Sequence, residues 1–241
     1  MGFIGGKMKI DFIGIGFHRC GTTFLCEVIN KHPKIWVHPD KEVCYFNDGN
    51  GVCKFDYSKY GLKGYEYLFS IAPKEKVVGE FSPGYIMDRN VMETLHKHFP
   101  KVKFIIMTRD KHERALSLLY VKIAKFREYN YSVKDAKEES DYEKYINNVS
   151  DILEKHEVLF LTMEEMRDNP DIFFKKVYDF LGVKNRKIKY SNLIKEKNEG
   201  NKKTEEGLKS FIIVNCSIFL KHLRMHPIYF KSYWKNKLKE K

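Results

Sequence analysis

A glycine-rich segment near the start of the chain combines residue types that bind phosphate groups. Residues 16–23 read Gly-Phe-His-Arg-Cys-Gly-Thr-Thr, with four residues between the two glycines. In a P-loop, this spacing lets backbone N–H groups and the N-terminus of the next helix surround a phosphate. Arg19 adds a cation, and the hydroxyl groups of Thr22 and Thr23 add donors. The segment therefore predicts a phosphate-binding loop.

The same segment departs from the loops of nucleoside triphosphatases. A Walker A loop has Lys directly after its second glycine, whereas this chain has Thr22 there. That lysine reaches the β- and γ-phosphates during phosphoryl transfer. Its absence disfavours a P-loop kinase or nucleotidase, which stays open as an alternative. A transferable group with less charge than a phosphoryl group, such as a sulfonate, would need less cationic help and no magnesium.

The loop needs a strand before it and a helix after it, and the sequence supplies both. Residues 9–15 are typical of a buried strand, and residues 22–30 of a helix. Further strands are expected at residues 35–37, 76–80, 102–107 and 158–161, and further helices at 64–71, 90–99, 111–127, 142–156 and 169–182. The alternation predicts an α/β fold of the P-loop-NTPase-like kind, with three layers, α/β/α, around a mostly parallel central sheet.

Neither a repeat nor a low-complexity linker interrupts these elements. We therefore expect a single domain over residues 1–241, with a core at about 9–224 and a basic tail at 225–241. Residues 186–206 are polar and are expected to form a loop, and residues 208–223 a final helix.

The charge balance points to an anionic partner. There are 44 basic and 32 acidic residues, a net charge of +12, and residues 221–241 alone contain seven basic residues and one acidic residue. Nucleotides, polyanions, nucleic acid or a membrane surface would suit such a chain, so a non-enzymatic polyanion-binding protein is a second alternative. We expect a nucleotide, and no nucleic acid, as the partner, and no membrane span.

Several sequence features bear on location and metal content. No apolar run approaches the ~20 residues that span a bilayer, and the first residues do not resemble a secretory signal. None of the five cysteines forms a Cys-x-x-Cys pair. These features predict a reduced, cytoplasmic protein without a metal site.

Several motifs, in order, resemble those of sulfotransferases that use 3′-phosphoadenosine 5′-phosphosulfate (PAPS). In that family a Lys or Arg lies two residues before Gly-Thr-Thr, as Arg19 does here. The heparan-sulfate branch is also similar in a Lys-Glu-x-x-x-Phe segment and a Gly-Glu-Lys-Ser-Pro-x-Tyr segment. These two segments are residues 41–46 and 79–85, and the other matching stretches are residues 30–35, 104–120 and 160–183. The resemblance spans about residues 9–183.

The resemblance implies which residues hold the donor. Arg19 would contact the 5′-phosphate and the bridging oxygen and stabilise the departing 3′-phosphoadenosine 5′-phosphate (PAP). Arg109 and Ser117 would bind the 3′-phosphate, which distinguishes PAPS from ATP. The remaining loop residues would bind the 5′-phosphate through main-chain and hydroxyl groups, and a late basic loop would close on the nucleotide: Cys20, Gly21, Thr22 and Thr23, and then Gly200 and Asn201. Trp36, Phe55 and Tyr190 are candidates for stacking on adenine.

The resemblance also implies a general base. Glu42 would take the proton from the acceptor hydroxyl, which is a poor nucleophile until a base removes that proton. His38 and Glu80 are rival bases. Phe81 stands where the branch has a lysine. Lys41 or Arg19 would then replace that cation, or the acceptor would be less charged than heparan sulfate.

Together these residues predict a PAPS-dependent sulfotransferase. It would transfer a sulfuryl group by in-line displacement to a hydroxyl or amine of an unidentified carbohydrate or small molecule, and PAP would be the other product. The polar and aromatic residues 125–141 and the basic tail would shape the acceptor site.

Overall fold

The structure is a computed structural model that describes residues 9–47, 57–125, 128, 130–186 and 190. The side chains of Ala124 and Lys125 are outside this description. The predicted final helix at 208–223, Gly200, Asn201 and Phe55 also lie outside the described residues.

A five-stranded parallel sheet forms the centre of the fold. Its strands are β1 (Phe12–Gly14), β2 (Ile35–Val37), β3 (Val77–Phe81), β4 (Lys103–Thr108) and β5 (Val158–Thr162), in the order β2-β3-β1-β4-β5. The chain builds the sheet to one side of β1 with β2 and β3, and to the other side with β4 and β5. Open α/β sheets bind ligands at the carboxyl end of such a switch point, which here is the loop after β1.

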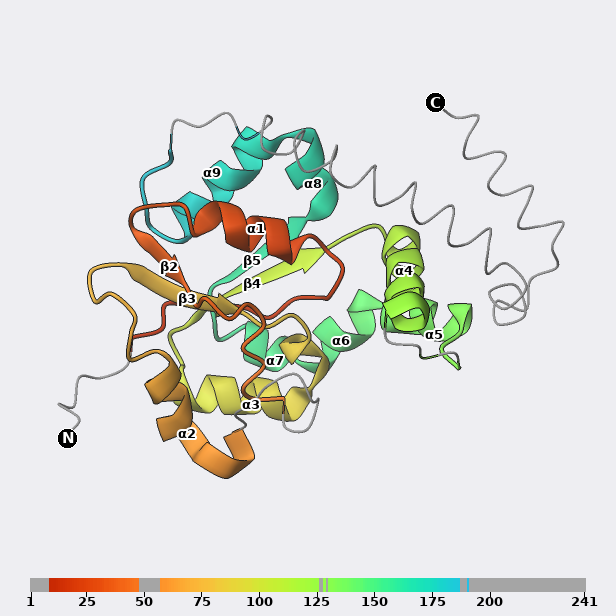
Figure 1. The fold of residues 1–241 in the computed structure, drawn as a ribbon, viewed down its shortest axis with the longest axis horizontal. Coiled ribbons are helices and arrows are strands. Elements are labelled where there is room, and N and C mark those ends of the chain that lie inside the picture. Colours follow the sequence, from red (N-terminus) through yellow and green to blue (C-terminus); the bar gives the residue numbers. More distant parts are fainter. Residues whose placement is uncertain (1–8, 48–56, 126–127, 129, 187–189, 191–241) are drawn as a thin grey trace, which may run out of the picture. The chain divides into compact units, whose positions relative to one another are not determined.

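Helices cover both faces of the sheet, as Figure 1 shows. One face carries α1 (Thr22–Ile29), α8 (Met163–Asp168) and α9 (Pro170–Phe180); the other carries α3 (Arg89–His98), α6 (Tyr142–Asn148) and α7 (Ser150–Leu153), with α2 (Tyr57–Leu68) nearby. A short 3-10 helix, η1 (Tyr85–Met87), follows β3. The predicted three-layer arrangement around a parallel sheet is confirmed.

The strands β1 and β3 interlock through two phenylalanines and two glycines. Phe12 pairs with Gly79, and Gly14 pairs with Phe81. A Cβ on either glycine would overlap the ring of its partner, and the two rings meet edge to face with centroids 5.9 Å apart. Phe81 is therefore a core residue that fills the space above Gly14, which gives the departure from the lysine of the resembling branch a structural role.

The chain divides into two compact units, Met1–Asp110 with Asp141–Ile188 and Lys111–Ser140 with Lys189–Lys241. The sheet belongs to the first unit. In the second, α4 (Lys111–Tyr120) leads into a π-helical segment, η2 (Val121–Lys125). The single domain over residues 1–241 stays a prediction.

The second unit contains a helix that the sequence analysis missed. Within the polar stretch 125–141, α5 (Val133–Glu139) begins at a capping box. The Asp135 N–H donates to Ser132 Oγ (3.2 Å), and the Ser132 N–H donates back to the Asp135 carboxylate (2.7 Å). Ala136 of α5 packs in one apolar cluster with Ala115, Leu119 and Ile123. A helix of seven residues with one buried side chain leaves little apolar periodicity to detect.

Other element boundaries differ from the predicted ones. The helix expected at 64–71 begins at Tyr57 and bends at Gly61, where φ is 56°. The helix expected at 142–156 is two helices, α6 and α7, and the one expected at 111–127 ends as an α-helix at Tyr120. The helix α8 was not predicted; it begins at its own capping box, formed by Thr162 and Glu165.

Candidate active site

The loop after β1 is held between two neighbouring segments of the first unit. A Cβ on Gly16 would lie 2.6 Å from the Met107 backbone nitrogen, so only glycine lets the loop approach β4 this closely. The Phe17 N–H donates to the Met107 carbonyl (3.4 Å), and the Gly84 N–H donates to the Gly16 carbonyl (2.6 Å). Both neighbours fix the course of the loop.

Gly21 ends the loop as the N-cap of α1. Its φ of 86° lies in the left-handed region, which glycine adopts without a Cβ clash, and Arg19 has a φ of 68°. The Gly21 carbonyl accepts hydrogen bonds from Phe24 (3.1 Å) and Leu25 (3.2 Å). Because the cap is a glycine, no side chain caps the first turn of α1. First-turn N–H groups lack partners within a helix, so this geometry suits an anion.

Tyr142 joins the loop to Arg109. Its hydroxyl group donates to the Arg109 carbonyl (2.8 Å), accepts from the Arg109 N–H (3.2 Å) and lies 3.6 Å from the Cys20 sulfur. Its ring packs on Phe17, with centroids 4.6 Å apart. The structure thus brings Arg109 and the loop to one tyrosine, a contact that the sequence analysis missed. Ser117 lies on α4, in the second unit.

Glu42 lies on a turn that reaches the loop. Its N–H donates to the Phe81 carbonyl at the end of β3 (2.9 Å), and its φ is 66°. One carboxylate oxygen accepts from Lys41 Nζ (2.9 Å), and the other lies 4.0 Å from His18 Nδ1. About a third of the Glu42 side chain (33%) is exposed. His18, another residue that sequence reasoning missed, therefore connects the predicted base to the loop.

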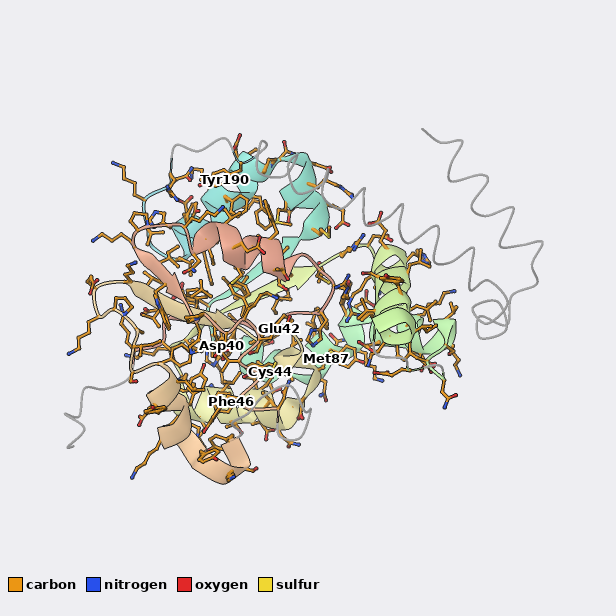
Figure 2. All side chains as sticks on the ribbon, viewed as in Figure 1. Asp40, Glu42, Cys44, Phe46, Met87 and Tyr190 are labelled. Atoms are coloured by element: carbon orange, nitrogen blue, oxygen red, sulfur yellow. The ribbon has the colours of Figure 1, made fainter. Side chains whose placement is uncertain are left out.

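A buried carboxylate, that of Glu80, supports this turn through Ser82. Glu80 is fully buried and accepts hydrogen bonds from the hydroxyl groups of Tyr65 (2.6 Å) and Ser82 (2.7 Å). Ser82 Oγ in turn accepts a hydrogen bond from the Cys44 N–H (2.8 Å). Cys44, like Glu42, has a positive φ, 49°. Burial raises the pKa of the Glu80 carboxyl to about 7, against the two hydrogen bonds that lower it. Figure 2 labels Glu42 and Cys44 on this turn.

The two rival bases are internal. Glu80 is sealed from solvent, so no acceptor can reach its carboxylate. His38 is 6% exposed, and its ring nitrogens face the Leu68 carbonyl (3.2 Å) and the backbone of Asp40. Trp36 has edge contacts with His38 and Phe69. Glu42 is therefore the most accessible of the three candidate bases.

The described residues also bear on membrane insertion and metal binding. In the described ranges, no helix is long and apolar enough to cross a membrane. In the same part of the chain, no group of three or more His, Cys, Asp or Glu side chains could hold a metal ion. The described cysteines Cys20, Cys26 and Cys44 are buried and form no disulfide, and burial raises the pKa of Cys26 to about 11.

Comparisons with known proteins identify the family of this chain. Residues 9–222 match the family model of the sulfotransferase domain. The chain is 32% identical over 152 residues to the membrane-associated sulfotransferase kil1 of Dictyostelium discoideum, which covers 60% of this chain and 29% of that protein. It is 31% identical over 103 residues to the mouse (Mus musculus) heparan sulfate glucosamine 3-O-sulfotransferase 5, covering 43% and 28%. The matched part is thus less than a third of the length of either relative.

Solved structures share the fold. A sulfotransferase from Alicyclobacillus acidocaldarius superposes with a TM-score of 0.58 and 19% identity, over 92% of this chain and 99% of that one. The sulfotransferase domain of the curacin biosynthetic pathway superposes with a TM-score of 0.56 and 18% identity, over 75% and 77%. The fold is the P-loop-NTPase-like fold of sulfotransferases, as predicted. Since the family model matches most of the sequence, the chain belongs to the sulfotransferase domain family.

Proposed function

We propose that this chain transfers the sulfuryl group of PAPS to a hydroxyl or amine group of an acceptor. One observation carries the proposal: the phosphate loop, which lacks the Walker lysine, lies beside an accessible carboxylate. His18 of the loop is 4.0 Å from Glu42. A phosphate-binding loop and a general base are the two parts that sulfuryl transfer to a hydroxyl requires.

The loop and Arg109 would hold the donor. Main-chain N–H groups of Cys20 and Gly21, with the hydroxyl groups of Thr22 and Thr23, would bind the 5′-phosphate, and Arg19 would stabilise charge on departing PAP. The 3′-phosphate would be bound by the cationic and hydroxyl groups of Arg109 and Ser117, and the late loop with Gly200 and Asn201 would close on the nucleotide. The uncapped start of α1 suits such a ligand.

Glu42 would act on the acceptor. The acceptor O–H proton passes to the Glu42 carboxylate, the acceptor oxygen forms a bond to sulfur, and the bond from sulfur to the bridging oxygen of PAPS breaks. Lys41 holds one carboxylate oxygen, which leaves the turn fixed with the second oxygen toward the loop. No metal takes part in this scheme.

We propose a carbohydrate or a small molecule as the acceptor. One matched relative is described as acting on glucosamine of heparan sulfate, which is a carbohydrate hydroxyl acceptor. Phe81 puts no cation at the end of β3, so the acceptor would carry less negative charge than heparan sulfate. Placement of the enzyme in the cytoplasm stays a prediction, because one matched relative is described as membrane-associated.

A transfer assay tests the proposal. The chain is incubated with radiolabelled PAPS, EDTA and a panel of acceptors that contains glucosamine oligosaccharides, simple sugars, phenols and alkylamines. We expect label on at least one acceptor and equal release of PAP. A strict requirement for magnesium, or phosphate transfer from ATP with stronger stabilisation by ATP than by PAP, would instead establish the kinase alternative.

A further inference from the structure

The peptide at Arg109 lies between two regular elements. Strand β4 ends at Thr108 and α4 begins at Lys111, so neither a sheet ladder nor a helix supplies the hydrogen bonds of residue 109. The Tyr142 hydroxyl supplies both, since it accepts from the Arg109 N–H and donates to the Arg109 carbonyl. Next along the chain, the Asp110 N–H donates to Glu164 of α8 (3.1 Å). Side chains of α6 and α8 thus contribute to holding this backbone.

The same tyrosine contacts the phosphate loop. The Tyr142 oxygen lies 3.6 Å from Cys20 Sγ, and that thiol is fully buried. The thiol also lies 3.6 Å from the carbonyl of His18. The tyrosine ring packs on Phe17, two residues before Arg19. A single buried side chain therefore touches the loop at two points and clamps the backbone that carries Arg109.

We propose that Tyr142 is a positioning residue that sets the preference for a nucleotide with a 3′-phosphate, because it fixes Arg109 relative to the loop. The inference rests on the proposed function, in which the loop holds the 5′-phosphate and Arg109 binds the 3′-phosphate. A guanidinium on a fixed backbone loses less conformational entropy when it binds than one on an unsupported backbone. The effect belongs to the 3′-phosphate, since the loop keeps its other contacts to Met107 and Gly84.

The variant Tyr142→Phe tests this inference, because it removes one oxygen and keeps the ring on Phe17. Isothermal titration measures the affinities of PAP and adenosine 5′-monophosphate, which differ in the 3′-phosphate. We expect the affinity for PAP to fall about tenfold, with the affinity for the monophosphate within about twofold of wild type. The matched control is Tyr145→Phe, on the same helix, whose ring also meets Phe17 (6.0 Å); it should leave both affinities unchanged.

A double-mutant cycle distinguishes positioning from a general loss of structure. In an Arg109→Ala background, Tyr142→Phe should have no further effect on PAP. Equal losses for both nucleotides, or an unchanged ratio of their affinities, would overturn the inference. Amide exchange of the wild type adds a test that needs no variant: the Arg109 amide should be protected, and exchange at the rate of an exposed loop amide would also overturn it.

The proposed function fails in a different way. Equal affinities of the wild-type chain for PAP and adenosine 5′-monophosphate would show that the chain has no 3′-phosphate site, and both proposals would be wrong. A wild-type chain that prefers PAP, combined with a Tyr142→Phe variant that keeps the full preference, would overturn the role of Tyr142 alone.

Discussion

The phosphate loop (residues 16–21) and the turn that carries Glu42 both contain left-handed backbone conformations, and different groups hold each of them in place. Each contains residues in the left-handed region, Arg19 and Gly21 in the loop and Glu42 and Cys44 in the turn. In residues other than glycine, such conformations persist only where surrounding structure holds them. The loop is held by backbone contacts and the neutral phenol of Tyr142, whereas the turn is held through Ser82 and a fully buried carboxylate.

The difference follows from what each region has to bind. A phosphate carries negative charge, so a buried carboxylate beneath the loop would oppose the ligand, and a neutral hydroxyl does not. The turn that carries Glu42 binds no anion in the proposed scheme, and a carboxylate beneath it is tolerated. The cost is that Glu80 titrates close to neutral pH, because burial raises its pKa to about 7. Support of the base should therefore depend on pH, and support of the loop should not.

The largest expected effect comes from changing the proposed base, Glu42, which should lower kcat without weakening donor binding. Glu42→Gln keeps the shape of the side chain and removes its capacity to accept a proton, so we expect kcat to fall about 10²–10⁴-fold. The affinity for PAP, measured by titration, should stay within about twofold. Glu27→Gln, an exposed glutamate on α1, is the matched control. A fully active Glu42→Gln enzyme would show that another group is the base.

The pH dependence of stability tests the buried carboxylate. Folding raises the pKa of Glu80 from 4.5 to about 7, so the native state binds this proton more tightly than the unfolded chain. The contribution of Glu80 to stability is therefore greatest below about pH 4.5 and falls by up to about 3 kcal/mol as the pH rises to 7.

Urea unfolding of wild type and Glu80→Gln at about pH 5 and about pH 8 measures this difference. The wild type should lose more stability than the variant between these two conditions. Glu66→Gln, an exposed glutamate of α2, should behave like the wild type. Parallel curves for wild type and Glu80→Gln would show that the buried carboxyl does not titrate in this range.

Ser82→Ala should affect the turn and spare the loop. It leaves the Cys44 N–H without its serine partner and takes one donor from Glu80, at a cost of about 1–3 kcal/mol. We expect kcat to fall about tenfold and the affinity for PAP to be unchanged. Tyr65→Phe is the matched control, because it also removes one hydrogen bond to Glu80 but keeps the ring in place and leaves the hydrogen bond from the Cys44 N–H to Ser82 intact. Equal losses of kcat in both variants would mean that Ser82 has no particular role in placing Glu42.

Local sequence patterns predicted the elements that carry the two regions. The glycine spacing at 16–21, the apolar strands and the Asn-Pro start of the last described helix are short-range signals, and the structure places each of them as expected. The role of Glu42 beside the loop was implied by resemblance, since no spacing rule links His18 to Glu42, 24 positions later.

The supports of the two regions could not be predicted in this way. Tyr142 is 122 residues from Cys20 and 33 from Arg109, and a tyrosine at the start of a polar helix has no pattern that indicates its partners. Glu80 lies near the end of an apolar strand and its residue type alone makes it a rival base; only its burial and its hydrogen bonds from Tyr65 and Ser82 identify it as a support. The role of Phe81 as a core residue is visible only from its pairing with Gly14 on the neighbouring strand.

His18 belongs to the loop in sequence but lies near Glu42 of the turn. A substitution of His18 has the smallest expected effect, and it tests directly which of the two regions this residue serves. Its Nδ1 is 4.0 Å from Glu42, and its Nε2 lies where a Cβ on Gly84 would come within 2.8 Å. Partly exposed pairs of this kind contribute about 0–1 kcal/mol, so His18→Asn should lower kcat by no more than about fivefold. The affinity for PAP should be unchanged. If His18→Asn instead weakened PAP binding and left kcat intact, His18 would serve the donor side, and the functional boundary between the loop and the turn would have to be redrawn at this residue.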